Sequence, residues 1–484
     1  MADTNIKTLG ELKKSGYTPK TIKEELRSNL IVKLKNKEKI FEGILGYDDT
    51  VIPDIERAIL SGHNILLLGL RGQAKTRIAR LMVHLLDEYI PIIKGNELND
   101  DPLNPITRHG VQTINEHGDN TSIEWIHRDE RYVEKLATPD VSIADLIGDV
   151  DPIKAATLKL PYSDQRVIHF GLIPRSHRSL FVVNELPDLQ PRIQVSLFNI
   201  LQEGDLQIRG FKLRLPLDIQ FVFTANPEDY TNRGSIITPL KDRIESQILT
   251  HYPVDVEESM SITFQEANIL PEQKEKISIS DIHRELIEMI SFTARESEFV
   301  DEKSGVSARL SITALERFVS SAERRMIVNG ESKTDTRIGD LWGIIPAITG
   351  KLELVYEGEQ EGPENVALHL MSEAINEMYL SFFGAEDGED ENKYISAVKA
   401  WFEDGNILDL NNYDDDATYK KKLNSVPGLK KMVMEAEPDD HEILPLMELA
   451  LHGLSEQQVL SKTLLNDKIT FSDPFKGMFD DLEN

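Results

Sequence analysis

A glycine-rich segment that ends in a lysine and a threonine is the clearest chemical signal in this chain. Residues 69–76 read Gly-Leu-Arg-Gly-Gln-Ala-Lys-Thr, between the apolar segment 64–68 and a segment rich in Arg, Leu and Ile. Glycines let a backbone curl so that its N–H groups point at phosphate oxygens, and a following helix adds its positive N-terminal end. In such a loop Lys75 contacts the β- and γ-phosphates of a nucleotide, and the Thr76 hydroxyl binds Mg²⁺. The residues predicted to bind the nucleotide are Gly69, Gly72, Gln73, Ala74, Lys75 and Thr76.

One position of this loop departs from the usual pattern, because Ala74 stands where glycine is common before the lysine. Alanine costs little there if the residue has helical dihedral angles, and that is our expectation. The simpler alternative for the whole segment is a glycine-rich turn between a strand and a helix that binds no ligand.

A second apolar segment, 179–183, ends in the polar pair Asn184-Glu185. In nucleoside triphosphatases with a phosphate loop, such a strand normally ends in Asp-Glu, where the Asp holds the Mg²⁺ shell and the Glu polarises the attacking water. Asn184 keeps a carbonyl oxygen but lacks the charge, so we expect weaker Mg²⁺ binding. Glu185 keeps the catalytic base. The alternative is a polar pair that only ends a strand.

These residues need strands and helices to bring them together. Between residues 43 and 255, short apolar segments alternate with amphipathic ones. Such alternation predicts an α/β core around a parallel sheet. Residues 95–120 are rich in Asn, Asp, Gly and Pro and indicate a surface loop or insertion. The expected strands are 64–68, 180–183 and 219–224, and the expected helices are 53–60, 77–86 and 192–201.

Three further regions surround the core, with a connector at 256–276. Residues 1–42 have a helical apolar spacing and a Thr18-Pro19 helix start, which predict an N-terminal helical extension. Residues 277–384 predict an all-helical domain, in which helix 337–354 is kinked at Pro346. Residues 385–484 predict an acidic, partly helical region, and we interpret its acidic runs, 386–391 and 414–416, as solvated linker.

Composition excludes several classes of protein. The 484 residues include 54 Lys and Arg, 83 Asp and Glu, and no Cys, for a formal net charge of −29. This charge argues against duplex binding, so nucleic acid is not an expected partner. The absence of Cys excludes disulfides and thiolate metal sites. The start is polar and no apolar run approaches the roughly 20 residues that span a bilayer, so we expect a cytoplasmic protein without membrane contact.

The motifs together resemble those of the AAA+ ATPases, in particular the I subunit of magnesium chelatase and its MoxR-like relatives. The resemblance spans about residues 40–383. Segment 43–48 is similar to the stretch that lines the adenine pocket in that family, which assigns Tyr47 to nucleotide binding. Segments 148–155 and 170–180 resemble the two sides of an inserted hairpin, and 206–214 resembles a second one. The resemblance implies an AAA+ core, a helical lid, and ATP and Mg²⁺ as cofactors.

The same resemblance implies roles for three more side chains. Asn226, at the end of the third expected strand, is the first sensor, which holds the water or reads the γ-phosphate; a plain Asn-Pro turn is the alternative. Arg243 projects into the nucleotide site of a neighbouring subunit, unless it is a surface residue paired to Asp242 or Glu245. Arg309 is the second sensor and reaches the γ-phosphate from the helical domain, unless it is a solvated residue at a helix start.

We therefore expect a Mg²⁺-dependent ATPase that forms a homo-oligomeric ring and remodels or activates a separate partner protein. In the resembled family that partner often carries a von Willebrand factor A domain. Asn184 motivates a second hypothesis, a nucleotide-gated scaffold with little hydrolysis. A third is a sigma-54-type transcription activator, whose characteristic Gly-Ala-Phe-Thr-Gly-Ala loop is absent from the sequence.

Overall fold

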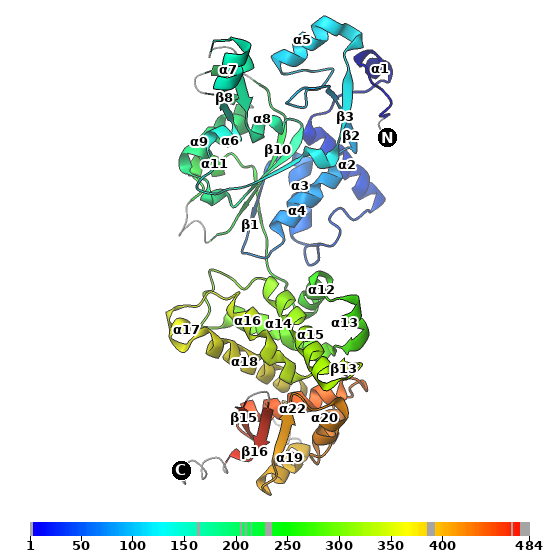
Figure 1. Cartoon of the computed structure of the whole chain (residues 1–484), viewed down its shortest axis with the longest axis vertical. Helices are drawn as coiled ribbons and strands as arrows, with labels where there is room; N and C mark the ends of the chain where they lie inside the picture. Colours follow the sequence, from blue (N-terminus) through cyan, green and yellow to red (C-terminus); the bar gives the residue numbers. More distant parts are fainter. Residues whose placement is uncertain are drawn as a thin grey trace. The chain divides into compact units, whose positions relative to one another are not determined.

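The computed structural model describes residues 3–161, 165–203, 206–208, 211–213, 215–227, 235–384, 393–465 and 468–474. The chain divides into two compact units, Met1–His251 and Tyr252–Asn484, and each is described by itself (Figure 1). Within the described residues, none of the helices combines the length and the apolarity that crossing a bilayer requires. The sequence-based boundaries at residues 42, 277 and 385 stay predictions.

The first unit is built on a five-stranded parallel sheet with the order β11-β1-β10-β7-β4. Its strands are β1 (Ile65–Leu68), β4 (Tyr132–Leu136), β7 (Ser179–Asn184), β10 (Ile219–Ala225) and β11 (Ser246–Leu249). Strands β1, β7 and β10 are buried along their whole length, which is why apolar residues predominate in each of them. The expected α/β class is therefore confirmed, and the carboxyl ends of β1, β10 and β7 lie at one edge of the sheet.

Helices cover both faces of this sheet. Leu66 and Leu68 pack in one cluster with residues of α9 (Pro191–Glu203), and Ile65 and Leu67 pack in another with residues of α2 (Ile22–Asn36), α3 (Val51–Ser61) and α4 (Lys75–Leu81). Three of these helices, α3, α4 and α9, match expected ones, although α4 ends in a 3₁₀ turn, Met82–Leu85. The short helices of the unit are α1 (Leu9–Lys14), α6 (Ile143–Leu146), α7 (Pro152–Leu158), α8 (Leu172–Arg175) and α11 (Thr238–Lys241).

In the described part of the first unit, three antiparallel pairs extend the fold. Strands β2 (Tyr89–Ile93) and β3 (Ile123–His127) flank the segment that we expected to be a surface loop or insertion. A plain loop does not describe this segment, because it contains α5 (Arg108–His117), which begins where the Thr107 hydroxyl accepts the N–H of Gly110. Pairs β5 (Gly148–Val150) with β6 (Ile168–Phe170), and β8 (Leu206–Ile208) with β9 (Phe211–Leu213), form the two inserted hairpins.

Helix α2 starts at Thr21 and not at Thr18-Pro19. Thr21 and Glu24 form a capping box, in which each side chain accepts a backbone N–H of the other residue, so the helix begins where its N–H groups find acceptors. The apolar side of α2 is buried except for Leu34, which is 38% exposed. Glu25, also buried, accepts two hydrogen bonds of 2.7 Å from the fully buried guanidinium of Arg131. The N-terminal helix is thus fastened to the core by a buried ion pair.

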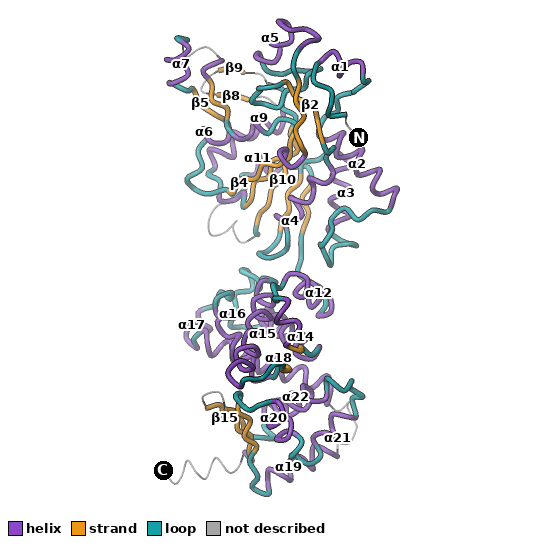
Figure 2. Tube along the Cα trace, turned by 45° about the vertical axis from the view of Figure 1, so that its right-hand side comes forward, coloured by secondary structure: helices purple, strands orange, loops and turns teal. Residues whose placement is uncertain are grey.

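The second unit is mainly helical, with a three-stranded antiparallel sheet at the end that carries the C-terminus (Figure 2). Residues on both sides of the gap at 385–392 share one hydrophobic cluster, so the C-terminal region packs on the helices before it. The longer helices are α12 (Val256–Glu266), α14 (Asp281–Glu296), α15 (Arg309–Asn329), α18 (Pro363–Phe383), α19 (Lys393–Glu403), α20 (Asp416–Leu423) and α22 (Ile443–Glu456). The shorter ones are α13 (Pro271–Lys276), α16 (Ile345–Thr349), α17 (Tyr356–Glu361) and α21 (Leu429–Met434). The sheet order is β14 (Leu408–Asn411), β16 (Lys468–Ser472) and β15 (Ser461–Leu465), and β12 (Ile277–Ser278) pairs with β13 (Thr334–Asp335).

The single kinked helix expected over 337–354 is wrong. A 3₁₀ helix covers Ile338–Ile344 and α16 begins at Ile345, so Pro346 lies in the first turn of a new helix. The first turn tolerates proline because its N–H groups have no partner within the helix.

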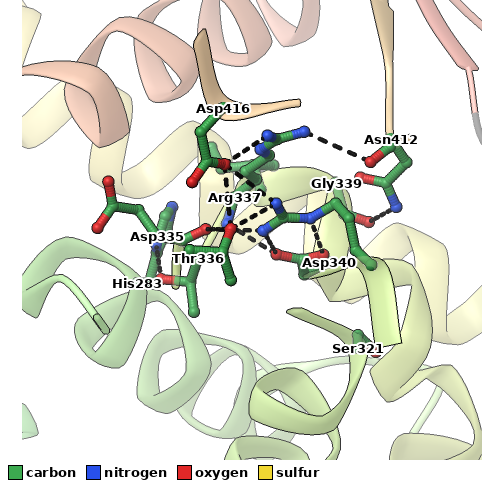
Figure 3. Close-up of polar contacts among 12 residues, drawn as sticks. His283, Ser321, Asp335, Thr336, Arg337, Gly339, Asp340, Asn412 and Asp416 are labelled. Carbon is green, nitrogen blue, oxygen red and sulfur yellow. Dashed lines mark hydrogen bonds and ion pairs between the residues drawn. The ribbon is translucent and has the colours of Figure 1, made fainter. Parts of the chain in front are cut away.

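Figure 3 shows a polar cluster that ties the C-terminal region to the helices of this unit. Arg337 donates to Asp416 at 2.6 Å, and the buried Arg325 on α15 donates to both oxygens of Asp340, at 3.2 and 3.0 Å. Asp416 also accepts from Arg325 at 3.3 Å. Our interpretation of 414–416 as solvated linker is therefore wrong, because this run starts α20 and pairs with two arginines. The other acidic run, 386–391, lies outside the described residues.

Glu448 on α22 is buried beside this cluster and accepts the N–H of Ile338 at 2.5 Å. Burial raises the pKa of Glu448 from its ordinary value of 4.5 to about 7, because desolvation of the charged form outweighs the hydrogen bond and the nearby Arg337. The folded unit therefore binds this proton more tightly than the unfolded chain does.

We predict that the second unit loses stability as the pH rises. The stabilising contribution of protonated Glu448 is complete below about pH 4.5 and is lost as the pH passes through about 7. Urea unfolding of the Glu448→Gln variant should show a flatter pH dependence, and above pH 7 the variant should be more stable than the wild type by roughly 1–3 kcal/mol. Glu364→Gln, at an exposed glutamate on α18, is the control. An unchanged pH slope in Glu448→Gln would contradict this account.

Candidate nucleotide-binding site

The predicted phosphate loop connects the buried strand β1 to helix α4. The backbone N–H of Gly69 donates to the carbonyl oxygen of Ala225 at 3.1 Å, which fastens the loop to β10. A Cβ atom added at Gly69 would lie 2.0 Å from the Thr250 hydroxyl and 2.1 Å from the Gln73 amide oxygen, so no larger residue fits there. The ammonium group of Lys75 lies 2.6 Å from the carbonyl oxygen of Gly69, so its charge is held over the loop. This arrangement fits the phosphates of a nucleotide.

Ala74 has left-handed backbone angles, with φ 53° and ψ 11°. Our expectation of helical angles at this position is therefore wrong. An L-residue in this conformation costs about 1–2 kcal/mol, because Cβ approaches the following carbonyl oxygen. Strain in a loop that binds phosphate is consistent with a functional site, where such conformations concentrate.

We predict that Ala74→Gly stabilises the first unit by about 0.5–1 kcal/mol. Glycine relieves the left-handed strain, although it also loses more conformational freedom on folding. Ala79→Gly is the matched control, because Ala79 lies inside α4 and the same exchange there removes a buried methyl group from a helix. In urea unfolding of the full chain, the free energy of unfolding should rise in Ala74→Gly and fall in Ala79→Gly, relative to the wild type. Destabilisation of similar size in both would contradict the assigned strain.

Thr76 and Asn184, the two residues predicted to hold Mg²⁺, are in hydrogen-bond contact, and their role at a metal stays a prediction. The Thr76 hydroxyl donates to the amide oxygen of Asn184 at 3.3 Å, and the Thr224 hydroxyl donates to the same oxygen at 3.2 Å. Three neutral oxygen atoms therefore converge beside the start of α4. Mg²⁺ takes oxygen ligands and usually keeps phosphates and waters in its shell, so these residues fit the ion without a charged ligand of their own.

Glu185 and Asn226 follow the two strands next to the loop. Glu185 is exposed and has left-handed backbone angles (φ 55°, ψ 51°), and its backbone N–H donates to the Thr224 hydroxyl at 3.1 Å. Asn226 directly follows β10 and is 6% exposed. Since β10 lies between β1 and β7, both residues share the sheet edge at which the loop begins. Their roles as base and sensor stay predictions.

Tyr47 and Gln73 support the loop from behind. The Tyr47 hydroxyl lies 3.2 Å from the carbonyl oxygen of Gln73 and 2.7 Å from that of His251, and the Tyr47 and His251 rings meet edge to face at 4.9 Å. The buried Gln73 amide oxygen accepts from the Thr250 hydroxyl at 2.7 Å. Both predicted residues thus brace the loop. The contact of Tyr47 with adenine stays a prediction.

The two predicted arginines lie on different units. The guanidinium of Arg243 lies 5.1 Å over the Phe198 ring and donates to the carbonyl oxygen of Pro239 at 2.7 Å. Arg309 is exposed and is the first residue of α15 in the second unit. The roles of both at a γ-phosphate stay predictions.

Sequence reasoning missed Glu134 on β4. Its carboxylate accepts from the Asn184 amide nitrogen at 2.6 Å, from the Tyr132 hydroxyl at 2.8 Å, and from Arg80 at 2.9 and 3.0 Å. Burial raises the pKa of Glu134, but hydrogen bonds from Arg80, Tyr132 and Asn184 outweigh it and hold this pKa below its ordinary value. No apolar run marks β4, so no local pattern indicates this carboxylate. Thr224 is marked in the sequence, because it is a hydroxyl residue near the end of a largely apolar strand.

No known family model matches the chain. Among solved structures, it is similar to a candidate ATPase from Cytophaga hutchinsonii, with 16% identity, a TM-score of 0.29 and coverage of 75% of this chain and 97% of that one. It is also similar to a complex of the magnesium chelatase subunits BchI and BchD, with 18% identity, a TM-score of 0.35 and coverage of 66% and 98%. A third match is NtrX from Brucella abortus in complex with ATP, with 14% identity, a TM-score of 0.35 and coverage of 60% and 53%.

Proposed function

We propose that this chain is an AAA+ ATPase of the magnesium chelatase I and MoxR-like type, which binds ATP and Mg²⁺ at the β1–α4 loop. The observation that carries this proposal is the convergence of the Lys75 loop, the Asn184-Glu185 pair and Asn226 at one edge of a parallel sheet. A glycine-rich strand-to-helix turn without a ligand would not need a base and an amide at the ends of the two strands beside it.

Each residue has a defined task in this proposal. Lys75 and the N–H groups of the loop hold the phosphates, and Thr76 and Asn184 hold the metal. Bound Mg²⁺ would neutralise charge on the phosphates. Glu185 accepts a proton from the attacking water, and Asn226 orients that water. The hydrogen bond from the Glu185 backbone N–H to the Thr224 hydroxyl fixes the backbone and so orients the carboxylate before the substrate binds.

The same proposal extends to assembly. Arg243 acts in the site of a neighbouring copy in a homo-oligomeric ring, where a trans arginine can raise phosphoryl transfer by about 10³–10⁵. Arg309 reads the γ-phosphate from the helical unit. The β5–β6 and β8–β9 hairpins pass the resulting motion to a separate partner protein that carries a von Willebrand factor A domain. We place this work in the cytoplasm.

Asn184 favours a second candidate, a nucleotide-gated scaffold. Its amide oxygen brings no negative charge to Mg²⁺, so binding without effective turnover is the expected behaviour if that charge is essential. ATP binding with turnover near zero would favour the scaffold, and steady hydrolysis would favour the motor.

Lys75→Ala tests the proposed site. Loss of a charge-assisted hydrogen bond to phosphate removes about 1.5–3 kcal/mol, so the variant should bind ATP roughly 10- to 150-fold more weakly than the wild type. Titration calorimetry on the full chain measures this. Lys13→Ala is the control, since Lys13 is half-exposed and pairs with Asp119 on the surface. Equal ATP affinity in Lys75→Ala and the wild type would overturn the assignment of the loop.

A further inference from the structure

Asn184 occupies the strand end where a carboxylate is usual, and its amide nitrogen donates to a carboxylate on the next strand. Strands β7 and β4 are paired in parallel, and the Glu134 carboxylate lies 2.6 Å from the Asn184 nitrogen. The negative charge missing from β7 is thus present on β4, one side chain further from the Thr76 hydroxyl.

Glu134 is itself held in place from α4. Arg80 donates two hydrogen bonds to it, at 2.9 and 3.0 Å, and the Tyr132 hydroxyl donates a third at 2.8 Å. Arg80 belongs to the helix that begins with Lys75 and Thr76. Hydrogen bonds therefore run from α4 through Glu134 to Asn184 and back to α4 at Thr76.

This circuit determines which way the Asn184 amide faces. An ionised carboxylate only accepts hydrogen bonds, so the atom turned toward Glu134 must be the amide nitrogen. The amide oxygen then faces the hydroxyls of Thr76 and Thr224, which can donate to it at 3.3 and 3.2 Å. Without Glu134, hydroxyl groups alone would not distinguish the two orientations, because each can donate or accept.

We propose that Glu134 is a positioning residue of the metal site, which keeps the Asn184 oxygen turned toward Mg²⁺ and supplies the negative charge that the strand end lacks. This inference rests on the proposed nucleotide site. Partners behind a metal ligand typically contribute 10- to 100-fold to metal affinity, because they orient the ligand.

The proposal changes what Asn184→Asp should do. Alone, that substitution places two carboxylates in direct contact, and like charges this close cannot both stay ionised without a penalty. When Asn184→Asp is combined with Glu134→Gln, the negative charge moves from β4 to β7. The amide at position 134 can then donate a hydrogen bond to the carboxylate at position 184. The two substitutions should therefore be strongly coupled.

The experiment measures binding of a non-hydrolysable ATP analogue to the full chain across a range of Mg²⁺ concentrations. Glu134→Gln should raise the Mg²⁺ concentration for half-maximal binding by about 10- to 100-fold. Asn184→Asp should bind no more tightly than the wild type, and the double variant should need at least about tenfold less Mg²⁺ than Asn184→Asp. Glu116→Gln, at an exposed glutamate on α5, should match the wild type. Nucleotide binding without Mg²⁺ should be similar in all variants, which separates metal positioning from a general structural defect.

Two results would overturn the proposal. One is that Asn184→Asp alone needs less Mg²⁺ for half-maximal binding than the wild type does, and that adding Glu134→Gln does not lower this concentration further. The other is that Glu134→Gln needs the same Mg²⁺ concentration as the wild type. Failure of the proposed function looks different, because the wild-type chain would then bind no nucleotide at all. In that case the same double-mutant cycle on urea unfolding, without any ligand, still reports whether Glu134 and Asn184 are coupled, and additive effects there would reject the pairing.

Discussion

Glu185→Gln should leave ATP binding intact and lower ATP turnover by about 10²–10⁴-fold. Glutamine keeps the size of the side chain but cannot accept a proton from the attacking water. The backbone that aims this side chain should not change, because its left-handed angles and its 3.1 Å hydrogen bond to Thr224 involve only main-chain atoms of Glu185. Steady-state hydrolysis and calorimetric binding on the same preparation separate the two effects.

Asp188→Asn is the matched control for this substitution, since it removes another carboxylate only three residues further on. It should change turnover by less than a factor of about three. If Glu185→Gln retained turnover within the same factor, Glu185 would not be the base, and the Asn184-Glu185 pair would be only the end of a strand.

The second large effect concerns stability. Glu25→Gln should destabilise the first unit by about 3–5 kcal/mol, because it removes the carboxylate that is hydrogen-bonded to the buried charge of Arg131. Arg131 is 0% exposed and donates both of its 2.7 Å ionic hydrogen bonds to Glu25. Its remaining bond, to the carbonyl oxygen of Arg178 at 2.9 Å, carries no compensating charge. Urea unfolding of the full chain measures the loss.

Glu38→Gln provides the comparison, since Glu38 pairs with Lys33 at 3.2 Å near the exposed end of the same helix. Exposed pairs contribute about 0–1 kcal/mol, so this variant should unfold almost as the wild type does. Equal stability of the two variants would mean that helix α2 is not fastened to the core by the buried pair.

The parts of the fold that the sequence predicts well are those with a local signal. Strands β1, β7 and β10 are covered by helices on both faces, so burial favours a largely apolar segment that can be recognised in the sequence by itself. The phosphate loop is also local, because the residues that make it are consecutive. For these strands each observed end either matches the predicted one or differs from it by one residue.

The features that the sequence does not predict depend on distant partners. In the sequence, Asp416 belongs to an acidic run that is typical of a solvated linker. In the structure it accepts a hydrogen bond from Arg337, which is 79 positions away. Glu134 becomes part of the site only because β4 pairs with β7, and its own strand has no apolar pattern. Ala74 has left-handed angles at the junction of the loop with α4, which no local preference of alanine indicates.

The most direct test of the central claim is steady-state ATP hydrolysis by the purified full chain, with Mg²⁺, across a range of protein concentrations. We expect measurable turnover whose specific activity rises with concentration, because Arg243 completes the site of a neighbouring copy. ATP binding without turnover at any concentration would contradict the claim that the chain is itself a motor, and would leave the nucleotide-gated scaffold as the function that this site supports.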